Sequence, residues 1–204
     1  MNHKLAVGIS WITHPLLMPT FLCILIRRFV PPALDPLEPR IFNYLLLLIF
    51  LSSFLIPVLS IMGLQGVVSM ARFRLEQRRE RILPFTLITL FYLVMAYFFK
   101  VKLDVNPLIQ RIFISISIIL ILVTLLTLFL KISIHATAAG GLTGYFLALA
   151  YLFPRYPLYI PVCGIILLSG IILSSRLQLN AHTPVEAYAG FSLGLLVSLI
   201  GLIL

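Results

Sequence analysis

The chain has 204 residues, of which 61% are hydrophobic and 10% are charged, and its mean hydropathy is +1.14. A soluble domain of this size cannot bury so much apolar surface, so the composition excludes soluble proteins and predicts a polytopic helical membrane protein. The net charge of +9 suits anionic lipid headgroups or phosphorylated substrates, although basic residues that flank membrane helices produce the same excess.

Seven apolar runs follow one another along the chain, separated by polar or proline-rich breaks. Most of them have about the ~20 residues that a helix needs to cross a bilayer. We therefore expect an all-α, polytopic transmembrane helical bundle that forms one integral membrane domain over residues 1–204. The runs cover residues 7–26, 41–68, 84–99, 108–130, 136–153, 158–174 and 185–204.

The first run could pass for a signal peptide, but no small-residue cleavage site precedes Arg27-Arg28. We expect it to be retained as a span. The connection that follows it, up to Arg40, contains too many prolines to be helical throughout. Within the span, His14-Pro15 predicts a kink at which the histidine bonds locally.

Polar residues concentrate in three connections, at residues 69–83, 131–135 and 175–186. These connections follow the second, fourth and sixth spans, so all three emerge on the membrane face that also holds the N-terminus. The connections on the opposite face are short or carry little of this polar chemistry. Counting spans therefore predicts that three polar clusters meet on one face.

The first polar connection is strongly basic. Five arginines lie between Arg72 and Pro84, and this number exceeds what two phosphate contacts require. A basic segment beside a span also binds lipid headgroups or sets topology, and both interpretations can hold together. The five are Arg72, Arg74, Arg78, Arg79 and Arg81.

The second connection reads Lys131-Ile132-Ser133-Ile134-His135. A histidine at the end of a span is a candidate acid or base at neutral pH. The alternative is an interfacial side chain that only makes hydrogen bonds. Which of these two interpretations applies to His135 depends on whether the third connection also carries residues suited to catalysis.

The third connection contains Arg176, His182 and Glu186. Arginine presents a planar fork of donors that suits phosphate, and ionisable residues at a bilayer boundary are candidates for function. His182 and Glu186 are four residues apart, so at a helix start the carboxylate can orient the imidazole. An oriented imidazole beside an arginine can attack phosphorus. Glu186 also completes a capping box with Thr183, and capping alone is the alternative role.

The third connection resembles a signature of the type 2 phosphatidic acid phosphatase family, Ser-Arg-x(5)-His-x(3)-Asp. Here the match is Ser175-Arg176, His182 and Glu186, with glutamate in place of aspartate, and Gly190 follows where the family often has glycine. The whole resemblance extends from Arg72 to Gly190, about half of the chain.

The other two connections resemble the remaining signatures less closely. Ser133 and His135 match Pro-Ser-Gly-His, but isoleucines replace the proline and the glycine, so the backbone contact to phosphate that the glycine allows is not expected here. For Lys-x(6)-Arg-Pro, two arginine pairs have the spacing of seven, and in neither does the second arginine directly precede Pro84. The pairs are Arg72 with Arg79 and Arg74 with Arg81.

The resemblance implies a six-helix phosphatase core over residues 41–204, preceded here by an extra N-terminal span and proline-rich connection over residues 1–40. It also implies hydrolysis of a lipid-linked phosphate or diphosphate without metal or cofactor. His182 would attack phosphorus, Glu186 would steady the imidazolium, and His135 would protonate the departing oxygen. The residues implied to hold phosphate are Arg176, Arg79, Arg81, Arg74, Ser133 and Ser175.

Three alternatives stay open. A lipid phosphotransferase would use the same site with a hydroxyl acceptor in place of water. A haloperoxidase has a related fold and anion pocket, but a membrane-embedded chain disfavours it. A non-catalytic lipid-binding membrane protein would have a decayed site, whereas His182, His135 and Arg176 are all present. We expect a lipid phosphate and membrane lipids as partners, and no nucleic acid.

Basic residues bear on the orientation of the site. The face that holds the site carries eight of the fifteen lysines and arginines, and the opposite face carries seven. If Arg176, Arg79 and Arg81 are retained for phosphate chemistry, five topological charges remain against seven. The positive-inside rule then places residues 27–40 in the cytoplasm and the site on the outer face, which is the periplasm in a Gram-negative bacterial inner membrane.

Overall fold

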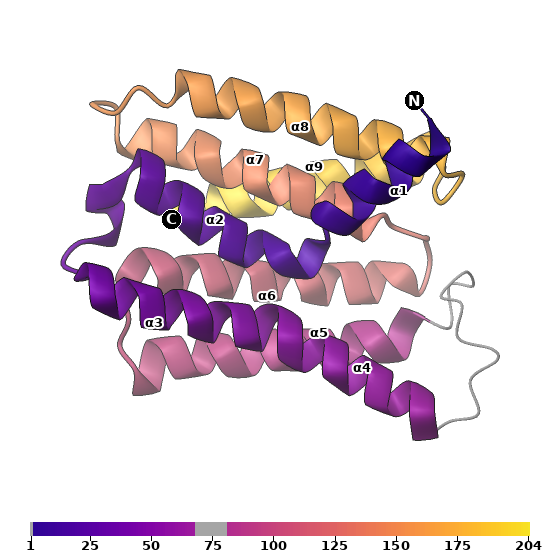
Figure 1. The fold of residues 1–204 in the computed structure, drawn as a ribbon, viewed down its shortest axis with the longest axis horizontal. Coiled ribbons are helices and arrows are strands. Elements are labelled where there is room, and N and C mark those ends of the chain that lie inside the picture. The colour runs from indigo at the N-terminus through magenta and orange to yellow at the C-terminus, as the bar shows by residue number, and fades with distance from the viewer. Residues whose placement is uncertain (1, 68–80) are drawn as a thin grey trace.

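The computed structural model describes residues 2–67 and 81–204, and within these ranges all regular structure is helical. The prediction of an all-α polytopic bundle is therefore confirmed (Figure 1). The α-helices are α1 His3–Ile12, α2 Met18–Phe29, α3 Pro39–Phe50, α4 Ile56–Val67, α5 Ile82–Tyr97, α6 Pro107–Thr127, α7 Ile134–Leu152, α8 Tyr159–Gln178 and α9 Pro184–Ile203.

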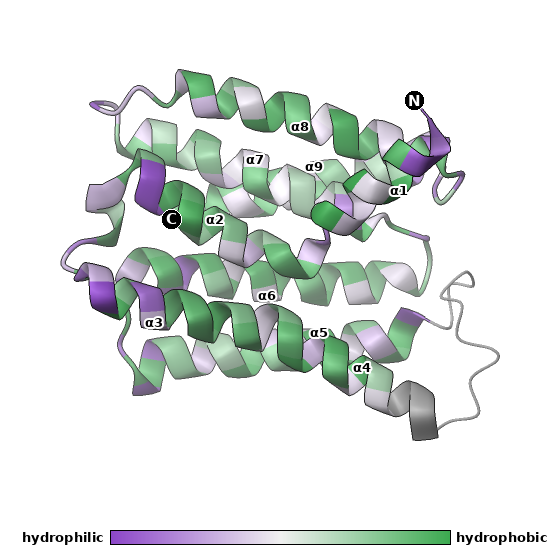
Figure 2. Cartoon of the chain, viewed as in Figure 1, coloured by the Kyte–Doolittle hydropathy of each residue, from purple (hydrophilic) through white to green (hydrophobic). Residues whose placement is uncertain are grey.

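Six of the described helical segments are long and apolar enough to cross a membrane. Two combine consecutive α-helices, and one continues α5 through a π-helical turn, η5 (Phe98–Lys102). Figure 2 shows hydrophobic residues along the helices and hydrophilic residues at several helix ends. The six segments are His3–Phe29, Pro39–Gly63, Ile82–Lys102, Pro107–Thr127, Tyr159–Gln178 and Pro184–Ile203.

Helix α7 corresponds to the fifth apolar run but differs from the six segments in its surroundings. Twelve of its 19 residues are buried, including Gly140, Gly141 and Gly144. A helix that faces other helices needs less apolar character than one that faces lipid. Helix α7 is therefore a central element of the bundle, packed against both α8 and α9.

The N-terminal span is kinked where the sequence predicts it. Helix α1 ends at Ile12, a 3₁₀ turn, η1, covers Pro15–Leu17, and α2 starts at Met18. The ring Nδ1 of His14 accepts a hydrogen bond from the Leu16 amide at 3.3 Å, so the histidine bonds locally at the kink. After this break α1 packs against α8, while α2 packs against α3.

Helices α7 and α9 pack closely because glycines replace side chains along their contact. A Cβ atom on Gly194 would overlap the main-chain carbonyl oxygen of Thr137, and one on Gly140 would overlap that of Phe191. Both helices begin at the same end of the bundle. The close packing therefore fixes the start of α7, with Ser133 and His135, beside the start of α9 with Glu186.

Figure 1 shows the N-terminus, the α6–α7 connection and the α8–α9 connection at one end of the bundle. The C-terminus and the connections α2–α3 and α7–α8 lie at the other end. This is the arrangement that the span count predicts for residues 131–135 and 175–186.

Candidate active site

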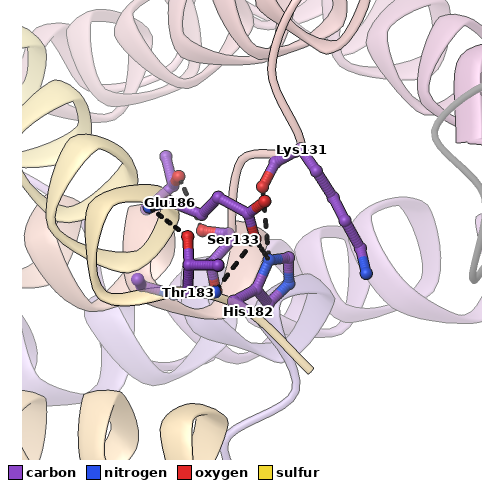
Figure 3. Close-up of polar contacts among 7 residues, drawn as sticks. Lys131, Ser133, His182, Thr183 and Glu186 are labelled. Carbon is purple, nitrogen blue, oxygen red and sulfur yellow. Dashed lines mark hydrogen bonds and ion pairs between the residues drawn. The ribbon is translucent and has the colours of Figure 1, made fainter. Parts of the chain in front are cut away.

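His182 lies in the connection between α8 and α9, with its imidazole held by two acceptors. Its Nδ1 is 3.0 Å from the Glu186 carboxylate oxygen Oε2 and 3.3 Å from the main-chain carbonyl oxygen of Lys131 (Figure 3). A carbonyl oxygen only accepts hydrogen bonds, so Nδ1 must carry the proton. The neutral ring then has its free lone pair on Nε2. This nitrogen can therefore act as a nucleophile.

Glu186 performs the two roles that the sequence left as alternatives. Its Oε2 accepts from the Thr183 amide at 3.1 Å, and its own amide donates to the Thr183 hydroxyl at 3.3 Å, which completes a capping box. The same oxygen receives the imidazole Nδ1–H of His182. The side chains of His182 and Glu186 are 3% and 22% exposed, so this pair is mostly shielded from water.

The surroundings of His182 favour its neutral form. Burial lowers the pKa of His182 below its ordinary value of 6.5, the hydrogen bond that it donates to Glu186 raises the pKa in part, and the nearby positive charges of Arg81 and Arg176 lower it further. The imidazole is therefore neutral at neutral pH, with Nε2 available for attack.

His135 lies in the first turn of α7 and is fixed by the N-terminal helix. Its Nε2 is 3.1 Å from the main-chain carbonyl oxygen of Ser10, so Nε2 carries a proton that it donates to α1. The His14 ring lies edge-on to the His135 ring, with their centroids 6.0 Å apart. A general acid at Nε2 would have to exchange the Ser10 carbonyl for an oxygen of the substrate.

Arg176 occupies the last turn of α8, where a cation suits the helix dipole. Its Nη1 donates to the Ser10 hydroxyl at 3.1 Å, and its Nε is buried without a partner. No carboxylate of the described residues pairs with this guanidinium. A partly buried cation without a counter-ion can bind an anion at low desolvation cost.

Arg81 directly precedes α5 and lines the same cavity as Arg176, His135 and His182. It lies close enough to interact electrostatically with Arg176, and with Glu186, whose charge opposes the effect of burial on the pKa of Arg81. The remaining arginines proposed to hold phosphate, Arg74 and Arg79, lie outside the described residues.

The resemblance implies that Ser133 and Ser175 hold phosphate, but in this structure both serines make hydrogen bonds that stabilise the helices. Ser133 is the N-cap of α7, where its hydroxyl accepts from the Ala136 amide at 3.4 Å, and its own amide donates to the Glu186 carbonyl at 3.4 Å. The Ser175 hydroxyl donates to the Ile172 carbonyl at 2.7 Å. Both serines are fully buried and neither lines the cavity, so their contribution here is to position the chain.

Three contributors to the site were not identified from the sequence. Ser10 contacts both Arg176 and His135, His14 packs against His135, and the Lys131 carbonyl fixes the His182 tautomer. Ser10 and His14 are four residues apart, a helical spacing of polar side chains that could have indicated a role for the first span. A main-chain carbonyl leaves no such signal.

The arrangement suits an anion more than a metal ion. Within the described ranges, no group of three or more histidine, cysteine or acidic side chains is placed to hold a metal. Helices α5, α7 and α9 all start at this end, and the positive ends of helix dipoles favour negative charge. Two arginines, a neutral imidazole and a half-buried carboxylate together can bind a phosphate and attack its phosphorus.

Comparisons with known proteins do not supply a functional assignment, so an assignment rests on the geometry of the site. No protein-family model matches the chain, and neither a curated protein nor a solved structure matches it.

Proposed function

We propose that the chain is a membrane-embedded phosphatase of the type 2 phosphatidic acid phosphatase kind, which hydrolyses a lipid-linked phosphate through a phosphohistidine. One observation carries the proposal. His182, with its lone pair on Nε2, lines the same cavity as Arg176, whose guanidinium has no carboxylate partner among the described residues. A nucleophile and an anion site in one cavity are the minimum requirement for phosphoryl transfer.

In the first step Nε2 of His182 attacks phosphorus, and the bond between phosphorus and the lipid oxygen breaks. Glu186 stabilises the positive charge that develops on the ring, while Arg176 and Arg81 neutralise the non-bridging oxygens. For this step His135 carries protons on both ring nitrogens, a form that the negative charge of the bound phosphate favours. It donates the Nε2 proton to the lipid oxygen as that oxygen leaves, which returns the ring to its neutral form. This donation uses the Nε2–H that now binds Ser10, so the leaving oxygen takes the place of the Ser10 carbonyl.

In the second step a water molecule attacks the phosphorus of the phosphohistidine. His135, now without its extra proton, accepts the proton of that water, and the P–N bond breaks. Inorganic phosphate leaves and His182 returns to its neutral form with Nδ1 protonated. Because the charge is neutralised by arginines and helix ends, this sequence requires no metal ion or cofactor.

Phosphate release by the purified protein, measured in a strong chelator, tests the proposal. The panel consists of phosphatidic acid, phosphatidylglycerol phosphate, a polyprenyl diphosphate and lipid A phosphate. We expect release from at least one of them, and none from the His182→Asn variant. Loss of activity in chelator that magnesium restores would contradict the mechanism, and transfer to an added lipid or sugar hydroxyl would identify a phosphotransferase.

A further inference from the structure

His14 is a half-buried histidine of the first span that the proposed reaction does not use. It is the N-cap of η1 at the kink, and it lines the same cavity as His182 and Arg176. The sequence predicts that His14 bonds locally at the kink, and it does so through one ring nitrogen only. The other ring nitrogen, Nε2, is therefore the one that can act in the cavity.

The local hydrogen bond fixes where the neutral His14 ring carries its proton. Nδ1 accepts from the Leu16 amide at 3.3 Å, so its lone pair is directed at that amide. The proton of the neutral ring is then on Nε2. Within residues 2–67 and 81–204, no acceptor is hydrogen-bonded to this nitrogen, so His14 presents an unused N–H donor at the cavity wall.

His14 lies beside His135, the proposed acid. The ring centroids are 6.0 Å apart and the rings are inclined at 77° to each other. An N–H···O bond is about 2.9 Å long, so two donors separated by roughly twice that length can bind different oxygens of one phosphate. The carbonyl oxygen of Ser10 now lies against Nε2 of His135, where the leaving oxygen would bind. A phosphate in that position has His14 as a neighbour.

The site also lacks the hydroxyl donor that the resemblance implies. Ser133 caps α7, is fully buried and does not line the cavity. The charge of the transition state is spread over three non-bridging oxygens of the phosphoryl group, and donors that are fixed in advance stabilise it best. Lys131 lines the cavity too, but its ammonium is carried on a flexible chain, whereas the ring of His14 is held at the kink.

We propose that His14 is a substrate-binding residue whose Nε2–H donates a hydrogen bond to a non-bridging oxygen of the substrate phosphate. The inference rests on the proposed phosphatase function, to which it adds a donor from the first span. The kink then serves the site directly, because the Leu16 amide occupies Nδ1 and keeps the proton of the neutral ring on Nε2.

Substitutions that retain one ring nitrogen's role at a time test this inference. In His14→Asn the side-chain oxygen can still accept from the Leu16 amide, because asparagine is a favoured N-cap residue, but the donor at the Nε2 position is lost. In His14→Gln the amide nitrogen reaches the Nε2 position and the local acceptor is lost. His3→Asn is the matched control, since His3 is an exposed histidine of α1 that does not line the cavity.

The readouts are the Tm of the unliganded protein and the Kd of hexadecylphosphonate, which has no ester bond to hydrolyse. We expect Kd to rise about tenfold in His14→Asn, because a hydrogen bond to a charged group is lost, while Tm stays close to that of wild type. His3→Asn should match wild type in both. An unaltered Kd in folded His14→Asn would overturn the inference.

A second pair guards against a His14→Asn protein that does not fold. His14→Met has the length of His14→Gln without its donor, and both variants lack the local acceptor. They should therefore have similar Tm values, both below that of wild type, while His14→Gln binds the phosphonate about tenfold more tightly than His14→Met. Equal Kd values in this pair would overturn the inference.

Hydrolysis of hexadecyl phosphate separates this inference from the proposed function. We expect kcat/KM to fall at least tenfold in His14→Asn and to match wild type in His3→Asn. Phosphate release with unaltered Kd and kcat/KM in His14→Asn would retain the phosphatase and overturn the role of His14. Weaker phosphonate binding in His14→Asn, together with no phosphate release by wild type from any substrate, would retain His14 as a phosphate-binding residue and refute the phosphatase. No phosphonate binding by wild type would overturn the inference.

Discussion

At the residue scale, one carboxylate oxygen performs two functions. Oε2 of Glu186 accepts from the Thr183 amide, which caps α9, and from the imidazole of His182, which fixes the tautomer. Because the cap holds the start of α9 in place, it also holds the carboxylate in position for the histidine. A substitution that retains the cap and removes the charge therefore distinguishes the two functions.

Glu186→Gln makes this distinction, since a capping box accepts glutamine at the same position. We expect Tm to stay close to that of wild type, because the side chain still accepts from the Thr183 amide. Phosphate release should fall at least tenfold, a loss of ~1.4 kcal/mol of transition-state stabilisation, because the charge that stabilises the imidazolium is removed. Wild-type activity in a folded Glu186→Gln protein would reduce Glu186 to a cap.

The pH dependence of kcat/KM tests the interaction between His182 and Glu186. Burial lowers the pKa of His182 below 6.5, and Glu186 raises it in part. The neutral nucleophile therefore persists below pH 6.5, and rates should decline only as the pH falls through this lowered pKa. Glu186→Gln removes a raising influence, so its acidic limb should move to still lower pH.

Comparing wild type with Glu186→Gln on one substrate cancels the ionisation of the substrate itself. An acidic limb that moves to higher pH in the variant would show that Glu186 does not support the charged form of His182.

At the element scale, the site depends on how closely α7 and α9 approach each other. Helix α7 carries His135 and α9 carries Glu186, so any separation of these helices changes the distance between the proposed acid and the nucleophile. The approach is set by glycines, of which Gly194 lies against the Thr137 carbonyl. The kinked first span contributes as well, because Ser10 on α1 binds both His135 and Arg176.

Gly194→Ala should weaken both stability and activity. Its Cβ would overlap the backbone of α7, and a backbone cannot move aside as a flexible side chain can. We expect Tm in detergent to fall by several degrees and phosphate release to fall with it. Gly170→Ala is the matched control, since a Cβ there meets no atom within 4 Å. Equal Tm values for the two variants would contradict the packing account.

At the scale of the whole molecule, sequence reasoning predicted the helices, their local contacts and which connections share one end of the bundle, but it missed the individual contacts between distant residues. Apolar runs predicted the helices, and the spacing of His182 and Glu186 predicted their hydrogen bond, because each depends on neighbours in the chain. The contacts of His135 with Ser10 and of His182 with Lys131 join residues 125 and 51 positions apart. Such contacts depend on packing that periodicity does not specify.

The predicted and observed bounds of the helices also differ in places. The first run was expected to start at residue 7, whereas α1 starts at His3, and the break around Pro15 is the kink that the sequence predicts. The third run was expected to end at Phe99, and η5 continues it to Lys102. The central position of α7 was not predicted, because its apolar run at residues 136–153 was counted as a span like the other six.

The orientation of the bundle is a further prediction at this scale. Single cysteines at Asp35 or Gln178, in a background without Cys23 and Cys163, mark the two ends, and both positions are exposed. If the site faces outward, an impermeant thiol reagent applied to intact cells, with any outer membrane permeabilised, labels position 178 and spares position 35. The reverse pattern would place the site in the cytoplasm.

The covalent intermediate on His182 is the central claim, and trapping it is the most direct test. Purified protein is mixed with a radiolabelled lipid phosphate, quenched in base during turnover, digested and analysed by mass spectrometry. We predict one phosphorylated peptide containing His182, labile to acid, formed and lost at rates compatible with turnover, and absent from His182→Asn. Phosphate release without this adduct, together with His182→Asn activity within about tenfold of wild type, would contradict the account.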